Sequence, residues 1–183
     1  EALVVAIDGF TKSLETDLPT YVMEDDSEAY SILNRLYLDL QVLEESQQQM
    51  KSAQELFGMD VLDSSTLSRH RSTLVAFKHM WDIAALIKDE AEVRGAYTWG
   101  ELDETTLDGI YEELKRSMTM LEELPGDIAR TTVYFTLHEQ CAKLQQTLPL
   151  IADLHDDAMR PRHWQQLALQ LKSRIDIRSV QDG

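Results

Sequence analysis

The residue types best suited to metal chemistry in this sequence are a histidine and a cysteine three positions apart. His138 and Cys141 would share one face of a helix, and two ligands on one face can begin a zinc site. Cys141, however, also continues an apolar stripe of the same helix, which is typical of a buried structural cysteine. We therefore predict that Cys141 belongs to a helix core with His138 at its border and that no metal is bound; a zinc-binding helical domain at these two residues is the alternative.

Paired acidic residues are the second group that could do chemistry, because two carboxylates can act as general acid and base. Adjacent helix positions point about 100° apart, so Glu44-Glu45 and Glu112-Glu113 would not converge on one substrate atom. The seven glycines build neither a phosphate-binding loop followed by lysine nor a nucleophile elbow. The sequence thus predicts no catalytic and no cofactor-binding residue, and the chain is expected not to be an enzyme.

Two further histidines lie among basic residues. His70 stands between Arg69 and Arg71, and His79 follows Lys78. Basic neighbours of this kind are typical of a solvated helix face. We predict that both histidines are solvated helix residues and not metal ligands.

The composition limits the partners that the chain can bind. It carries 33 acidic and 17 basic residues, a net charge of −16. Nucleic acid, anionic membranes and the acidic microtubule lattice all require a basic face, so we expect no direct contact with any of them. No apolar run approaches the roughly 20 residues of a membrane span. Cys141 is the only cysteine, which favours a reducing compartment. Partners are expected to present basic or apolar surface.

Apolar residues recur at helical spacing along most of the chain. The predicted helices cover residues 3–14, 27–57, 63–95, 103–125, 127–149 and 161–171. Gly58 is expected to end the second helix, Asp103 to cap the fourth, and Pro149 to end or kink the fifth. Short connections between amphipathic helices indicate an all-α fold, an elongated bundle or stack of antiparallel helices.

One short region combines proline, arginine, histidine and tryptophan more densely than a solvated connector would. Its residues are Leu148, Pro149 and Leu150, followed after a gap by Arg162, His163 and Trp164. We predict a corner between two helices in which Trp164 fills a pocket. Arg162 and His163 are expected to hydrogen-bond the carbonyls exposed at a helix end.

This region resembles the dynein heavy chain family, in which the pattern LPLI-x-x-L followed by RHW marks the passage from the N-terminal tail to the linker. Residues 148–154 and 162–164 carry the two halves of this pattern. Similarity at the level of pattern extends upstream to about residue 54, through Leu56-Phe57-Gly58, the helix at residues 74–81, Trp99 and Leu102-Asp103. Arg160-Pro161 and Gln165-Gln166 look more like axonemal than cytoplasmic heavy chains.

The resemblance implies a non-catalytic part of a very large microtubule motor. Residues 1–58 would be tail helices, 59–160 a helical bundle leading to the linker, and 161–183 the start of the linker, cut short at the end of this sequence. The segment would act as a lever or scaffold between the tail and a downstream ATPase ring, and ATP and Mg²⁺ would bind only in that ring. Its partners would be the rest of the heavy chain and, as further candidates, other dynein heavy, intermediate or light chains. The expected location is the axoneme of a cilium or flagellum, with the cytoplasm as the alternative.

A second interpretation is a protein-interaction module that mediates heavy-chain dimerisation or docks accessory chains. The apolar stripe of the second helix would then face another chain instead of the chain's own core. Its residues are Leu33, Leu36, Leu40, Leu43 and Met50. With several amphipathic helices in one chain, packing within the chain is the favoured arrangement.

Overall fold

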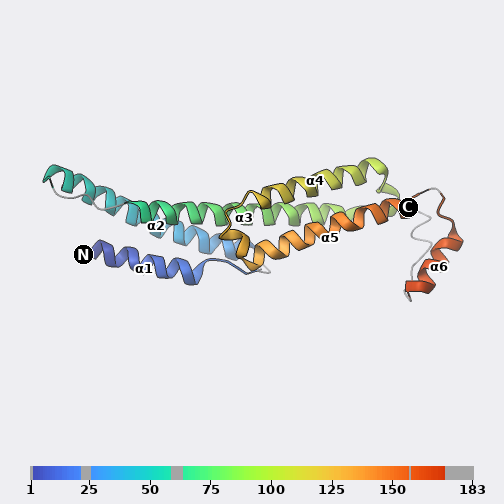
Figure 1. The fold of residues 1–183 in the computed structure, drawn as a ribbon, viewed down its shortest axis with the longest axis horizontal. Helices are drawn as coiled ribbons and strands as arrows, with labels where there is room; N and C mark the ends of the chain where they lie inside the picture. Colours follow the sequence, from blue (N-terminus) through green and yellow to red (C-terminus); the bar gives the residue numbers. More distant parts are fainter. Residues whose placement is uncertain (1, 22–25, 59–63, 157, 172–183) are drawn as a thin grey trace. The chain divides into compact units, whose positions relative to one another are not determined.

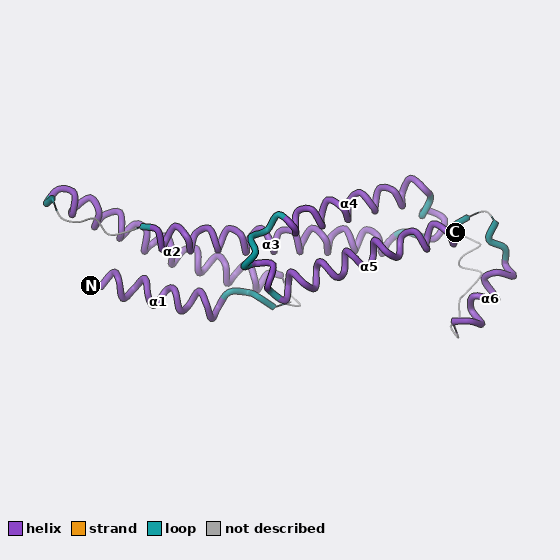
Figure 2. The backbone as a smooth tube through the Cα atoms, viewed as in Figure 1, coloured by secondary structure: helices purple, strands orange, loops and turns teal. Residues whose placement is uncertain are grey.

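The computed structural model describes residues 2–21, 26–58, 64–156 and 158–171, and every regular element among them is a helix (Figures 1 and 2). The α-helices are α1 (Ala2–Asp17), α2 (Asp26–Leu56), α3 (Ser65–Ala96), α4 (Glu104–Glu122), α5 (Thr132–Leu154) and α6 (Pro161–Leu171). Two 3-10 helices, η1 (Trp99–Glu101) and η2 (Ile128–Arg130), precede α4 and α5. The predicted all-α fold is confirmed. No helix in the described ranges combines the length and hydropathy that crossing a membrane requires.

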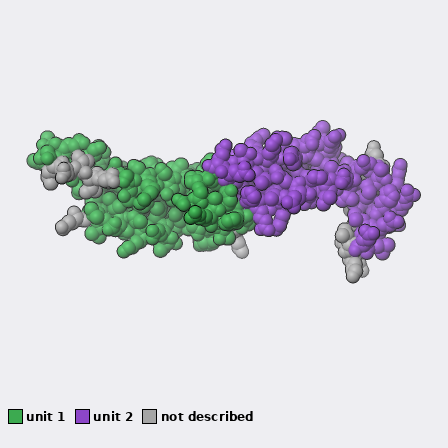
Figure 3. All heavy atoms as spheres, in the orientation of Figure 1, with its two compact units in different colours: residues 1–85, 124–136 green, residues 86–123, 137–183 purple. Residues whose placement is uncertain are grey.

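The chain forms two compact units (Figure 3). Unit 1 comprises residues 1–85 and 124–136, and unit 2 comprises residues 86–123 and 137–183. The predicted limits at residues 58 and 160 do not coincide with these units, because α1 and α2 belong to one unit with the first part of α3. The functional division into tail and linker stays a prediction, and residues 172–183 of the predicted linker start lie outside the described ranges.

The core of unit 1 is an apolar seam formed mainly by three helices. The buried side chains of α1 are those of the N-terminal apolar stripe, and α2 packs beside α1. The buried set includes Leu3, Ile7, Phe10, Leu14, Ala29, Leu33, Leu36, Leu40, Leu67, Leu74, Phe77, Met80 and Trp81. Fully burying one such large apolar side chain stabilises a fold by about 1.5–3 kcal/mol. Amphipathic spacing therefore accounts for how these helices associate.

The α2 stripe that was predicted as an interaction face points largely into this core. Leu33, Leu36 and Leu40 are buried, Leu43 is half-buried and Met50 is exposed. The favoured arrangement, packing within the chain, thus holds for Leu33, Leu36 and Leu40, and the alternative in which these three face a partner does not, because the core of unit 1 covers them. Leu38 and Val42, which are also exposed, lie on another side of α2.

The loop between α1 and α2 is held by hydrogen bonds to two other segments of unit 1. The indole N–H of Trp81 donates to the carbonyl of Pro19 at 3.2 Å. The carbonyl of Thr20 accepts from the backbone N–H groups of Thr132 and Val133 at 3.1 and 3.4 Å. Because the first N–H groups of a helix have no partner within the helix, this carbonyl satisfies two donors at the start of α5. The loop thereby ties α3 and α5 to the end of α1.

Unit 2 buries side chains from the second part of α3 and from α4, α5 and α6. They are Ile87, Leu107, Ile110, Leu114, Leu121, Leu137, Cys141, Leu148 and Trp164. As predicted, Asp103 caps α4, where its Oδ1 accepts from the N–H of Thr106 at 2.8 Å. Hydrogen bonds from Thr106 and Thr105 lower the pKa of the Asp103 carboxyl. The start of α4 is thus fixed by local chemistry that the sequence already displays.

A proline and a glycine near two helix ends behave differently. Pro149 was predicted to end or kink α5; the helix runs through it to Leu154, so it does not end there, and the kink stays a prediction. Proline removes one backbone hydrogen bond, and Pro149 lies on the exposed side of α5. Gly58 follows α2 with a φ of 66°, a left-handed conformation that glycine adopts without strain. This confirms that the glycine terminates α2.

Candidate functional site

The predicted helix corner lies in unit 2, where three aromatic rings meet. We call Trp99, His155 and Trp164 the aromatic corner. The ring centroids of Trp99 and Trp164 are 5.5 Å apart with an interplanar angle of 85°, and those of Trp99 and His155 are 5.4 Å apart at 35°. An edge-to-face pair adds about 0.5–1.5 kcal/mol to the effect of burial. Trp164 is buried, as predicted.

A hydrogen bond fixes His155 within the aromatic corner. Its Nε2 lies 3.0 Å from the carbonyl oxygen of Trp99. Because a carbonyl oxygen only accepts, Nε2 carries the proton and donates. His155 directly follows α5 and Trp99 begins η1, so the bond joins the end of α5 to the turn before α4. This histidine is used to hold two elements together.

The start of α6 corrects the prediction for Arg162 and His163. Pro161 is the first residue of α6, as predicted. The N–H of Arg160 donates to Nδ1 of His163 at 3.2 Å, and Nε of Arg162 lies 3.1 Å from Nε2 of the same ring. A neutral imidazole has one acceptor nitrogen, so one of these two bonds forms at a time. His163 accepts here instead of donating to carbonyls, because a helix N-terminus exposes N–H groups.

The other residues of the predicted corner are not gathered at one point. Leu148 is buried in the core of unit 2, whereas Pro149, Leu150 and Arg162 are exposed. His155 was missed as a partner of Trp99 by the sequence reasoning, and no local pattern could have paired residues 56 positions apart. The only signal was a histidine placed just after a helix end.

His70 contradicts the prediction of a solvated histidine, because only 5% of it is exposed. It lies on α3 at helical spacing from Leu67 and Leu74, and this phase turns it into the core of unit 1 despite its basic neighbours. Its Nε2 is 3.0 Å from Oγ1 of Thr11 in α1, and the ring of Phe10 packs edge-on at 5.7 Å. Burial, and next the charge of Arg69, lowers the pKa of His70, while Glu15 opposes this.

Cys141 is buried in unit 2, in line with the apolar stripe that it continues. Burial raises the pKa of its thiol, and the nearby Arg94 partly offsets this. Within the described ranges, no group of three or more His, Cys, Asp or Glu side chains is placed to hold a metal ion. The position of Cys141 thus suits packing better than nucleophilic chemistry, which needs a lowered pKa.

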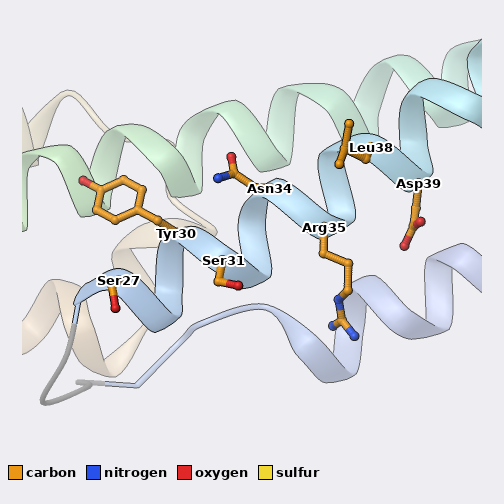
Figure 4. A pocket seen from close by; sticks show the side chains of 7 residues that line it. All are labelled: Ser27, Tyr30, Ser31, Asn34, Arg35, Leu38 and Asp39. Carbon is orange, nitrogen blue, oxygen red and sulfur yellow. The ribbon is translucent and has the colours of Figure 1, made fainter.

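Unit 1 carries two surface cavities along α2. One, of about 650 Å³, is drawn in Figure 4 and is lined by Ser27, Tyr30, Ser31, Asn34, Arg35, Leu38 and Asp39. The other, of about 350 Å³, lies between α2 and α3. Arg35 is engaged with Asp17 of α1 at 2.6 Å.

Comparison with known proteins gives a consistent match. A family model described as "Dynein heavy chain, N-terminal region 2" matches residues 67–182, well over half of the chain. Similar proteins include the dynein beta chain of the flagellar outer arm of Chlamydomonas reinhardtii, 28% identical over 162 residues, and human dynein axonemal heavy chain 10, 23% identical over 163 residues. The dynein-1-beta heavy chain of the flagellar inner arm I1 complex of Chlamydomonas reinhardtii is 29% identical over 133 residues.

These alignments cover most of this chain and little of its relatives. They span 88%, 89% and 72% of the chain for the three proteins, but only 3%, 4% and 3% of the relatives themselves. The chain therefore corresponds to a short segment within proteins that are many times longer.

Proposed function

Because the chain belongs to the dynein heavy chain family, through a match to its N-terminal region, we propose that it is a mechanical segment that couples the heavy-chain tail to an ATP-driven motor ring elsewhere in the parent protein. The family assignment itself confirms the resemblance to dynein heavy chains. The finer role, that of a lever or scaffold at the passage from tail to linker, is the content of the proposal.

The observation that carries this proposal is that the side chains best suited to chemistry are committed to helix packing. His70 bonds Thr11 between two helices, His155 bonds the carbonyl of Trp99, and Cys141 is buried in an apolar core. A segment that transmits force needs helices locked to one another, and these contacts supply such locking. In this proposal ATP and Mg²⁺ bind in other parts of the parent chain.

Partners and location follow from the same proposal. The first partner is the rest of the heavy chain, and further dynein chains are candidates. The relatives named above are flagellar or axonemal dyneins, which supports a place in the axoneme of a cilium or flagellum in preference to the cytoplasm. Direct contact with microtubules, nucleic acid or membranes is not part of the proposal, because the chain carries a net charge of −16.

The test destabilises the core of unit 2 within the parent heavy chain. It then compares the effect on microtubule gliding velocity with the effect on ATP turnover. Leu114 of α4 is buried in unit 2, and Leu114→Ala should cost about 2–5 kcal/mol of local stability. We expect ATP turnover of the purified motor to stay within about twofold, because no nucleotide group is touched. Microtubule gliding velocity should fall at least about twofold, because load passes through a softer segment.

The matched control is Leu150→Ala, which removes the same atoms from an exposed leucine of the same unit. It should leave both ATP turnover and gliding velocity unchanged. Equal loss of turnover and velocity in Leu114→Ala would contradict a purely mechanical role. Micromolar binding of ATP by the 183-residue chain in a calorimetric titration would contradict it as well.

A further inference from the structure

The last described helix, α6, is anchored in unit 2 by a single deeply buried side chain. Among residues 162–170 only Trp164 is buried, three others are half-buried and the rest are exposed. Leu169 on the same helix is 79% exposed. For comparison, α4 buries five residues in the same unit. The attachment of α6 therefore depends on one residue far more than that of its neighbours does.

The start of α6 is stabilised by its own residues. The N–H of Arg160 donates to Nδ1 of His163 at 3.2 Å, and the N–H of His163 donates to the carbonyl of Arg160 at 2.8 Å. In the connector before it, the N–H groups of Ala158 and Met159 donate to Oδ1 and the carbonyl of Asp156 at 2.7 and 2.9 Å. None of these hydrogen bonds would be lost if α6 moved away from the other helices.

The contact that joins α6 to the turn before α4 is the edge-to-face pair of Trp164 and Trp99. Within the described ranges, no hydrogen bond or ion pair links residues 162–170 to another helix of unit 2. Breaking a buried hydrogen bond leaves a donor or an acceptor unpaired, which is costly, whereas separating apolar surfaces carries no such polar penalty. Release of α6 therefore costs the loss of packing alone.

The other half of this contact is held in place without α6. The carbonyl of Trp99 accepts from Nε2 of His155 at 3.0 Å, and the two rings pack with centroids 5.4 Å apart. The same turn is closed by Glu101, whose carboxylate accepts from the N–H and the hydroxyl of Thr98, both at 2.8 Å. Trp99 is thus positioned by the end of α5 and by its own turn, ready to receive Trp164.

We propose that α6 is a latch: a helix that docks on unit 2 and leaves it as one element, while α3, α4 and α5 stay folded. The pair of Trp99 and Trp164 is the contact that closes the latch. When α6 is docked, unit 2 fixes the direction of the chain at α6, and when α6 is released that direction is no longer set. The latch deepens the proposed mechanical function, in which α6 would pass load only while it is docked.

The latch predicts two separate opening events in unit 2. α6 has 11 residues, and a helix of this length is marginal in water by itself, so its amides should exchange with solvent each time the latch opens. The core amides of α4 and α5 should exchange only when the core itself opens. Such local and larger openings have their own free energies, so one core substitution can affect them differently.

The test is hydrogen exchange of the 183-residue chain under native conditions, followed amide by amide by NMR. Leu114→Ala weakens the core of unit 2, and it should speed exchange of the core amides of α4 and α5 at least about tenfold. The amides of α6 should stay within about twofold of wild type, because Leu114 remains packed when only the latch opens.

Parallel acceleration of α6 and α4 in Leu114→Ala would overturn the proposal, because α6 would then open only together with the core. Ile110→Val is a milder change in the same core. It allows the same comparison if Leu114→Ala does not fold, with about twofold to tenfold faster exchange expected in α4 and α5 and none in α6.

Substitutions on both sides of the contact test whether it closes the latch. Trp164→Ala should speed exchange of the α6 amides about a hundredfold, and Trp99→Leu about threefold to tenfold, the range for an edge-to-face pair. In the Trp164→Ala background, Trp99→Leu should add less than about twofold, because the contact is already gone. Leu169→Ala, at an exposed position of α6, is the matched control and should have no effect.

The contact pair would be refuted if Trp164→Ala changed exchange in α6 no more than Leu169→Ala, or if the two tryptophan substitutions acted independently. These measurements use the chain alone and record neither motion nor ATP turnover. A failed latch therefore leaves the mechanical role to the gliding assay, and a failed gliding assay does not affect the exchange result.

Discussion

The two compact units each bury a tryptophan, but they anchor it by different means. In unit 1, Trp81 is buried and its indole N–H donates to the carbonyl of Pro19 at 3.2 Å. In unit 2, Trp164 is buried by an edge-to-face contact with Trp99, whose ring centroid is 5.5 Å away. One anchor depends on a directional hydrogen bond, and the other depends on ring packing.

These two kinds of anchor predict which substitution each unit tolerates. The hydrogen bond from Trp81 holds the carbonyl of Pro19, and the next carbonyl, that of Thr20, accepts from two backbone N–H groups at the start of α5. The contacts of α3 and α5 with this stretch of backbone therefore depend on each other. The aromatic corner of unit 2 holds the short helix α6 by ring contacts that another aromatic side chain could also make. Unit 1 should therefore be sensitive to the loss of one donor, and unit 2 to the loss of a ring.

The largest expected effect is that of Trp81→Ala in unit 1. Removing a buried tryptophan typically costs about 3–5 kcal/mol, and the buried carbonyl of Pro19 would also lose its donor, which adds about 1–3 kcal/mol. We expect a loss near the top of the first range, about 5 kcal/mol, measured by urea unfolding of the chain. A loss below about 2 kcal/mol would contradict the role of Trp81 as the anchor of unit 1.

A phenylalanine at the same position isolates the hydrogen bond. Trp81→Phe keeps a large ring but removes the N–H group, and it should still cost about 1–3 kcal/mol. Hydrogen exchange should be fastest at the first amides of α5 in this variant, because Thr20 is no longer held in place to accept from them. If hydrogen exchange instead rose uniformly across unit 1, the proposed link between the Pro19–Thr20 backbone and the start of α5 would be contradicted.

The second prediction concerns the aromatic corner. Trp164→Ala should cost about 3 kcal/mol, at the lower end for a buried tryptophan, because the ring gives up packing and the contact with Trp99 but no hydrogen bond to a described residue. Trp164→Phe should cost less than about 1.5 kcal/mol, since edge-to-face packing survives. Both free-energy costs are measured as the loss of protection from hydrogen exchange at the amides of α6.

Leu169→Ala is the control for this helix, because Leu169 is largely exposed on α6 and its truncation should leave exchange unchanged. If Trp164→Ala lowered the stability by less than about 1 kcal/mol, Trp164 would not have the packing role assigned to it in the aromatic corner. If Trp164→Phe instead proved as damaging as Trp81→Phe, the contrast between the two units would fail.

Helix ends set by local chemistry were predictable from the sequence, and contacts across helices were not. Asp103, Gly58 and Pro161 each mark a helix end through their own backbone or side-chain preference, and the structure confirms all three. Pro149 failed as a stop because its effect depends on which side of α5 faces water. That information lies in the packing and not in the local pattern.

The candidate site shows the same limit. The apolar stripe of α2 was visible in the spacing of its leucines, but spacing alone could not say whether another chain or unit 1 itself covers it. The cavity between α2 and α3 is lined by side chains of both helices, so the pattern of one helix could not show it. His70 was misjudged because its charged neighbours were given more weight than its helical phase with Leu67 and Leu74.

The smallest predicted effect is a pH dependence of the stability of unit 1. It arises because His70, a titratable group, is buried in the core of this unit. The pKa of His70 is lowered by burial and by Arg69, while Glu15 of α1 opposes the shift and Thr11 contributes a neutral hydroxyl. The unfolded chain, with a histidine pKa of about 6.5, therefore binds the proton more readily than the folded one. Stability is retained above that value and is lost as pH falls from there toward the folded pKa.

We expect the urea midpoint of the chain to fall between pH 7.5 and pH 5.5, with exchange in α1 rising first, because protonation charges the buried ring that packs against Phe10 and Thr11. His70→Gln removes the titrating group while leaving an amide that can bond Thr11, and it should cost about 1 kcal/mol at pH 7.5. In this variant the decrease between the two pH values should shrink markedly. If wild type and variant lose stability in parallel, or if α6 in unit 2 responds before α1, another group controls the pH dependence and His70 does not distinguish the two units.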